Sequence, residues 1–436
     1  MCSQLSHALG ATQAESRTTF PHFRIWTLGV ACVATAVSCS PPEVDEHAPG
    51  QSRGESVGGV TDLHGSNAFG FALYDHVVAG AVDSNVFLSP SSAALALALA
   101  TEGAGGSTRA ALARTLGSEA LSPEEFTKRN AALVRSLASA EQVTLVVANA
   151  FWGDADVPFD KSFAARLAGD YRATVETVDL QAPDFPARAN AWVSRQTAGK
   201  IPTLVDAPLG GDATLYLANA VYFKGKWTDA FEPRRTAPAP FLLPDCKSRP
   251  QPFMRREGTY AYFADSAFRI ARLPYRGNRL AMYVILPAKR VEPITVRRPT
   301  ETWFSGAVRR LTPTELAVAL PRFVLRYAAP LNGPLSAMGA APAFGPGADF
   351  TRAISAATPK SRRVYISEVA QQTYVEVNEE GTEAAAATSV ALSDSGGAPP
   401  PLPFVVDHPF VVVIRDDKTG ALLFLGQITN PASGGT

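Results

Sequence analysis

The chain has 436 residues, 46% of them hydrophobic, and its 40 basic residues balance its 40 acidic residues. The hydrophobic content is sufficient for a large buried core. A net charge of zero excludes a broad electrostatic field that would draw the chain to nucleic acid or to anionic surfaces. Arginine pairs such as Arg255-Arg256 and Arg309-Arg310 are scattered, which is typical of a solvated surface. We therefore expect no nucleic-acid partner.

The N-terminal segment has the layout of a secretory signal. Two arginines precede an apolar stretch of small residues, 25–37, which leads into Ser38-Cys39. Such a stretch predicts an exported chain, and small residues before a cysteine resemble a bacterial lipobox, in which Cys39 would carry a lipid. We expect residues 1–39 to be a signal peptide with this lipobox. Residues 40–61 are rich in Pro, Gly, Ser and charge, which predicts a flexible tether.

The expected signal peptide determines which cysteines the mature chain keeps. Cys2 and Cys32 lie in the expected signal peptide, so the mature chain would keep Cys39 and Cys246. With Cys39 acylated, no internal disulfide could form, and one free cysteine is expected. We therefore expect the mature protein outside the cytoplasm, either secreted or anchored to the cell envelope. It would contact the membrane only through the lipid on Cys39.

A pair of serines and an apolar run precede the segment 374–392 in the sequence. Ser89 and Ser92 stand at the expected start of a helix, because Pro90 suits a first helical turn; ordinary helix capping would also explain them. Residues 217–227 form an apolar, aromatic run that includes Asn219 and ends just after Gly225. This run predicts a central strand that leads into a turn.

The segment 374–392 indicates a chain with two states. Apolar and polar residues alternate up to Val377, and Gly381 then allows an unusual backbone angle. If the strand continues, one of its faces carries nothing larger than threonine before Val390, so that face could be buried in a packed sheet. Proline and glycine at 396–401 nevertheless predict an exposed loop just downstream. The alanine-rich run alone would also fit a helix capped by Thr382.

Seven motifs, in order from about residue 62 to the C-terminus, resemble those of the serpins, which trap serine proteases by inserting their own loop into a sheet. The motifs are residues 85–92, 103–108, 190–201, 217–227, 378–388, 404–415 and 424–431. One such motif is weak evidence for a family, but seven motifs in the family order are specific evidence. With the leader that ends at Cys39, the chain is identified as a bacterial lipoprotein-type member of the family.

The resemblance implies an α+β serpin fold. It consists of a large central β-sheet, two further sheets, about eight to nine surrounding helices and an exposed reactive-centre loop, within a single domain of residues 62–436. It also implies a monomer with no cofactor and no metal, which acts as a suicide substrate of a target serine protease and is not an enzyme. The cleaved loop would insert into the central sheet and trap the acyl-enzyme.

The resemblance also implies which residues of this chain form the functional regions of a serpin. The hinge comprises Glu379, Glu380, Gly381, Thr382, Glu383, Ala384, Ala385, Ala386, Ala387 and Thr388. The shutter and breach regions, where the sheet opens, comprise Ser89, Ser92, Asn219, Trp227 and Gln371. Family members often have histidine and lysine where this chain has Gln371-Gln372. Glutamine cannot titrate, so a pH-sensitive shutter is not expected.

There are two candidates for the reactive bond. Counting from Gly381 as in the family gives Ser395-Gly396, and Asp394-Ser395 lies one residue away. A small residue before the bond favours an elastase- or subtilisin-like protease, whereas aspartate favours an acid-selective one. Neither Arg nor Lys occurs between Gly381 and Phe410, which argues against trypsin-like targets.

Two other functions stay as alternatives. A non-inhibitory serpin would be cut as a substrate or would act as a binding protein, although the small residues of the hinge favour an inhibitor. A serine hydrolase is the remote alternative, because a catalytic triad need not be local in sequence. The chain has no HExxH zinc motif, G-x-S-x-G elbow, Walker loop or dinucleotide fingerprint, so no motif supports an enzyme.

Overall fold

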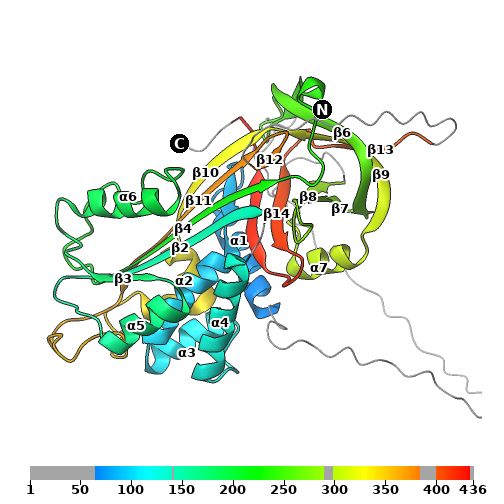
Figure 1. Cartoon of the computed structure of the whole chain (residues 1–436). Helices are drawn as coiled ribbons and strands as arrows, with labels where there is room; N and C mark the ends of the chain where they lie inside the picture. The colour runs from blue at the N-terminus through cyan, green and yellow to red at the C-terminus, as the bar shows by residue number, and fades with distance from the viewer. Residues whose placement is uncertain (1–63, 140–141, 289–297, 383–398, 433–436) are drawn as a thin grey trace, which may run out of the picture. The chain divides into compact units, whose positions relative to one another are not determined.

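We describe the chain from a computed structural model, in which the described residues are 64–139, 142–288, 298–382 and 399–432 (Figure 1). The chain divides into two units, residues 1–58 and residues 59–436, and all described residues belong to the second. The expected signal peptide and tether lie outside the described residues. No helix within the described ranges is long and apolar enough to cross a membrane.

Eight α-helices occur among the described residues, in agreement with the expected eight to nine. They are α1 (His64–Ala79), α2 (Pro90–Gly103), α3 (Gly106–Thr115), α4 (Pro123–Ala138), α5 (Lys161–Asp170), α6 (Phe185–Gln196), α7 (Glu301–Arg309) and α8 (Asn332–Leu335). Shorter helical turns span Pro233–Arg235, Ser336–Ala340 and Ala341–Ala343. Helices and strands follow one another irregularly along the chain, as expected for an α+β fold.

The central sheet has six strands in the order β10-β11-β4-β2-β3, with β12 paired to β4. Their bounds are β2 (Val143–Gly153), β3 (Thr174–Thr177), β4 (Leu215–Lys226), β10 (Phe323–Pro330), β11 (Ile366–Val377) and β12 (Gly381–Thr382). Strands β4 and β11 run parallel and pair directly, from Leu215 opposite Ile366 to Tyr222 opposite Tyr374. Figure 1 shows them side by side, β4 in green and β11 in orange. We call this line of pairing the β4–β11 seam.

The other strands form one continuous sheet of nine, in the order β1-β15-β14-β8-β7-β6-β9-β13, with β5 paired to β6. Their bounds are β1 (Val86–Leu88), β5 (Ala237–Leu242), β6 (Ser248–Ala264), β7 (Phe268–Pro274), β8 (Leu280–Pro287), β9 (Thr312–Pro321), β13 (Leu402–Val405), β14 (Phe410–Asp416) and β15 (Leu422–Ile428). The two further sheets expected from the sequence are joined here, because the 17-residue β6 pairs with β5, β7 and β9 in turn.

Strand β4 is buried on both faces, as its apolar sequence predicts. Leu217 and Val221 belong to the main core together with α2, while Tyr216 and Ala218 belong to a second core with Trp192 of α6. Successive side chains of a strand point to opposite faces, so these two cores lie on opposite faces of β4. A strand inserted beside β4 would therefore have to place side chains in both cores.

Helix α2 is anchored from its first residue. Its N-cap residue, Ser89, makes no side-chain capping bond, unlike Ser122 and Glu125, which form a capping box at α4. The Ser89 hydroxyl instead donates to the carbonyl oxygen of Leu423 in β15 at 2.6 Å. The helix-capping explanation of Ser89 is therefore wrong, and its hydroxyl ties the start of α2 to the nine-stranded sheet.

Candidate functional site: the hinge and the shutter

The hinge begins as a short strand at one end of the seam. The chain turns tightly after β11, where the Asn378 N–H donates to the Gly381 carbonyl at 2.8 Å and the Gly381 N–H donates back at 3.2 Å. Gly381 and Thr382 then pair antiparallel with β4, opposite Lys226 and Gly225. Gly381 has φ of +145°, and a Cβ there would lie 2.1 Å from the carbonyl oxygen of Gly225. Only glycine fits this approach, as the sequence predicted for a bend.

Thr382 is fully buried at this end of the seam. Its hydroxyl lies 3.1 Å from the hydroxyl of Tyr275, whose ring stacks on Trp227 with centroids 4.6 Å apart. Burial raises the pKa of Tyr275, and the hydrogen bond with Thr382 opposes this rise. A neutral phenol and a neutral hydroxyl therefore surround the first hinge side chain, and this environment disfavours a charge at position 382.

Trp227 anchors the turn from the other side. Its indole N–H donates to the Asn378 carbonyl at 3.0 Å, and its backbone N–H donates to the Glu380 carbonyl at 2.8 Å. The side chain is only 2% exposed. Trp227 thus packs where the loop enters the sheet and contacts the chain itself, as the sequence analysis expected.

The hinge region also contains an ion pair. The Glu379 carboxylate accepts hydrogen bonds from the Thr236 hydroxyl at 2.5 Å and from the Arg322 Nε at 2.7 Å. Burial raises the pKa of Glu379, but the hydrogen bonds from Arg322 and Thr236 outweigh it and leave that pKa below its ordinary value. The Glu379 side chain is 7% exposed and the Arg322 side chain 44%, so this pair borders on water.

Four predicted shutter residues meet in the middle of the seam, all of them buried. Gln371 of β11 accepts from the Ser89 N–H at 2.9 Å and donates to the Ser89 carbonyl at 3.1 Å and to Asn219 Oδ1 at 2.7 Å. Asn219 of β4 donates in turn to the Ser92 hydroxyl and to Asn149 Oδ1, the latter at 2.7 Å. The network therefore joins β11, β4 and the start of α2 through neutral groups alone.

Two residues of the site were missed. Asn149 lies directly opposite Asn219 in the pairing of β2 with β4, and a lone asparagine inside an apolar strand was a usable signal, because buried amides need partners. Tyr275 follows β7 and reaches Thr382 across 107 positions of sequence, so no local pattern could have identified it. The fifth predicted residue, Trp227, lies at the hinge and not in this network.

Other predicted residues lie outside the described part of the chain. These are Glu383, Ala384, Ala385, Ala386, Ala387, Thr388, Asp394, Ser395, Gly396 and Cys39. Cys246 is disulfide-bonded, so the expectation of one free cysteine is wrong. Among the described residues, no cluster of His, Cys, Asp or Glu could hold a metal ion.

Comparison with known proteins gives a consistent result. The family model described as "Serpin (serine protease inhibitor)" matches residues 64–431. A bovine leukocyte elastase inhibitor is 34% identical over 374 residues, which cover 82% of this chain and 95% of that protein. Wheat Serpin-Z2A is 33% identical over 378 residues, covering 83% and 94%. The crystal structure of tengpin, a thermophilic serpin, in its native state matches with a TM-score of 0.76 and 26% identity, covering 84% of this chain and 94% of that one.

Proposed function

Since this chain belongs to the serpin family of serine protease inhibitors, we propose that it traps an elastase- or subtilisin-like serine protease as a suicide substrate. The protease attacks the loop that follows Thr382 and becomes joined to it as an acyl-enzyme. Cleavage frees the upstream arm, which inserts between β4 and β11 and carries the protease along before deacylation. The observation that carries the proposal is the pairing of Gly381 and Thr382 with β4, because these residues already form the start of the inserted strand.

Insertion has a clear driving force in this sheet. One parallel ladder between β4 and β11 is replaced by two antiparallel ladders, one on each side of the new strand. A strand of roughly a dozen residues adds about ten net backbone hydrogen bonds, each worth ~0.5–1.5 kcal/mol. This gain requires side chains that fit the space beside β4. One face of the new strand offers threonine and alanine at 382, 384, 386 and 388, and the other face begins with Glu383 and Ala385.

We place the reactive bond at Ser395-Gly396, with Asp394-Ser395 as the alternative. Serine before the bond suits a shallow primary pocket. The absence of Arg and Lys between Gly381 and Phe410 argues against a trypsin-like target. The names of similar mammalian proteins, leukocyte elastase inhibitors at 33–34% identity, support the elastase-like choice.

The test mixes the chain lacking residues 1–39 with elastase, subtilisin, chymotrypsin and trypsin, followed by denaturing gels. We expect an SDS-resistant band at the summed mass with elastase or subtilisin and none with trypsin. N-terminal sequencing of the released fragment should begin at Gly396, or at Ser395 for the alternative bond. Cleavage in the loop with neither a band nor a rise in thermal stability would contradict trapping and favour the non-inhibitory alternative.

We also propose that the chain is exported and acts outside the cytoplasm as a monomer. The signal layout of residues 1–39 supports export. Cys39 has two mutually exclusive chemistries, because its sulfur cannot both carry a lipid and join a disulfide. Mass spectrometry of the mature chain separates these forms: an acylated Cys39 supports the envelope anchor, and an unmodified chain whose thiols appear only after reduction supports secretion.

A further inference from the structure

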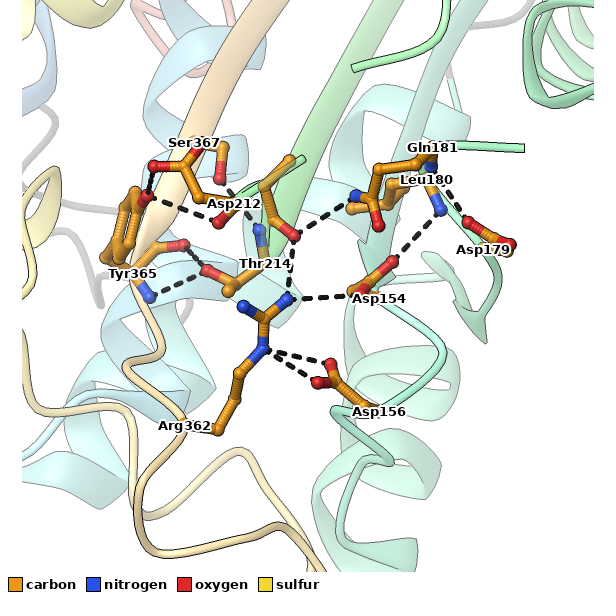
Figure 2. A network of polar contacts seen from close by, with 11 residues as sticks. Asp154, Asp156, Asp179, Leu180, Gln181, Asp212, Thr214, Arg362, Tyr365 and Ser367 are labelled. Atoms are coloured by element: carbon orange, nitrogen blue, oxygen red, sulfur yellow. Dashed lines mark hydrogen bonds and ion pairs between the residues drawn. The ribbon is translucent and has the colours of Figure 1, made fainter. Parts of the chain in front are cut away.

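A second polar network ties β4 to β11 at the end of the seam opposite the hinge (Figure 2). The buried Thr214 hydroxyl donates to the Tyr365 carbonyl at 2.5 Å and accepts from the Tyr365 N–H at 2.9 Å. The Thr214 N–H donates to Ser367 Oγ at 2.8 Å, and the Tyr365 hydroxyl donates to Asp212 Oδ2 at 2.6 Å. We call Asp212, Thr214, Arg362, Tyr365 and Ser367 the distal network.

Arg362 extends this network to the residues that follow β2. Its Nη2 donates to Asp154 Oδ2 at 3.1 Å and to the Ala213 carbonyl at 3.3 Å, and its Nε donates to Asp156 Oδ1 at 3.0 Å. Figure 2 shows the guanidinium between these groups. Three strands, β2, β4 and β11, are therefore held together at this end by side-chain contacts in addition to their backbone ladders.

The register places the distal network in the path of the inserting strand. Thr382 lies opposite Gly225 in an antiparallel pair, and each further residue of the new strand moves one residue back along β4. Leu215, the first residue of β4, lies ten positions before Gly225. A strand that keeps this register sets residue 392 opposite Leu215, residue 393 opposite Thr214 and residue 395 opposite Asp212.

We propose that the distal network is a kinetic barrier to the last stage of loop insertion and sets how often a cleaved inhibitor completes the trap. Earlier stages separate β4 from β11 mainly at backbone pairs and at the shutter. The last stage must also break the bonds of Thr214 with Tyr365 and Ser367, which leaves buried backbone groups transiently without partners. Ser395 carries the protease in the proposed function, on which this inference rests, so deacylation can compete until this stage is complete.

Peptides test the barrier without any protease. A fluorescein-labelled peptide with the sequence of residues 382–395 reaches the distal network in the register above, whereas one of residues 382–391 stops short of it. We expect Thr214→Val in the full chain to raise the incorporation rate of the longer peptide at least about fivefold, because the substitution removes both hydrogen bonds between the Thr214 hydroxyl and Tyr365. The rate of the shorter peptide should not change. Fluorescence anisotropy measures both rates.

The matched control is Arg279→Gln, which removes an ion pair to the buried Asp416 away from the seam. This variant lowers general stability and should affect both peptides equally. An unchanged rate of the longer peptide in Thr214→Val, or an equal gain for both peptides, would overturn the proposal. Ser367→Ala and Tyr365→Phe each remove one of the other bonds and serve if Thr214→Val does not fold.

The same variants connect the barrier to inhibition. With a protease that forms the SDS-resistant complex, Thr214→Val should raise the ratio of complex to cleaved inhibitor, and Arg279→Gln should not. An unchanged or lower ratio for Thr214→Val overturns the role in trapping. If the unaltered chain forms no complex with any protease, the proposed function fails, but the peptide comparison still decides whether the distal network limits insertion.

Discussion

The hinge and the shutter both join β4 to β11, but they use different chemistry. At the hinge, an ion pair between Glu379 and Arg322 borders on water, and Thr382 contacts the hydroxyl of Tyr275, whose ring stacks on Trp227. At the shutter, neutral amides and hydroxyls around Asn219 are buried from water. Charge is tolerated where water can solvate it, whereas a buried charge without a partner is costly. Changes of pH should therefore act on the hinge and leave the shutter unaffected.

The largest effect is expected from a charge placed in the buried part of the hinge. Position 382 is buried beside the neutral Tyr275 already in the uncut chain, so an arginine there would leave the sheet. Insertion of Thr382→Arg would then have to bury the guanidinium, at a cost of several kcal/mol, and each ~1.4 kcal/mol slows insertion about tenfold. We expect the complex on denaturing gels to fall by more than about tenfold while cleavage continues. Thr382→Ser is the control and should retain trapping. An unchanged yield of complex would show that trapping does not require residue 382 to be buried in the sheet.

The next effect concerns the shutter. Asn219→Ala leaves the buried amides of Asn149 and Gln371 with fewer partners, so we expect the free energy of unfolding to fall by about 2–3 kcal/mol. Urea denaturation followed by circular dichroism measures this loss. Arg188→Ala, which removes an exposed ion pair with Glu176, should cost less than about 1 kcal/mol. Equal losses in the two variants would contradict a special role of the buried network.

A titratable group would convert the shutter into a pH-sensitive site. Gln371→His places an imidazole in a fully buried position, where burial lowers the pKa of a histidine. A lowered folded-state pKa means that stability is lost as the pH falls below the ordinary histidine value. We expect a loss of about 1–2 kcal/mol between about pH 7 and about pH 5. The unaltered chain, melted under the same conditions, should show no such change from its shutter.

The smallest effect is expected at the ion pair of the hinge, which joins a buried glutamate to a partly exposed arginine. The pKa of Glu379 lies below its ordinary value of 4.5, so its contribution to stability is present above about that pH and is lost as the pH falls through the lowered pKa. Glu379→Gln should remove this part of the acid dependence and cost less than about 1 kcal/mol near neutrality, because Arg322 is nearly half exposed. Thermal melts from about pH 3 to about pH 6 measure the difference. Identical acid profiles of the two proteins would exclude a role for Glu379.

The sequence predicted the strand up to Val377, the bend at Gly381 and the central strand at 217–227, and each matches the structure. These features depend on local patterning and backbone preference, which a short window contains. Thr382, the expected cap of the alternative helix, belongs to β12, and the residues of that helix lie outside the described part of the chain. Gly381 and Thr382 pair with β4, about 155 positions away along the chain, whereas the alanine run that follows lies outside the described residues.

The sequence by itself determined the serpin family, the small side chains of the hinge and the absence of a titratable residue at position 371. Only the tertiary structure decided that Asn149 completes the shutter, that Tyr275 covers Thr382, and that Thr214 meets Tyr365 at the far end of the seam. These partners come from segments far apart in the chain, and their contacts depend on the strand register. Register is a collective result of packing on both faces of β4, and no short stretch of sequence contains that information.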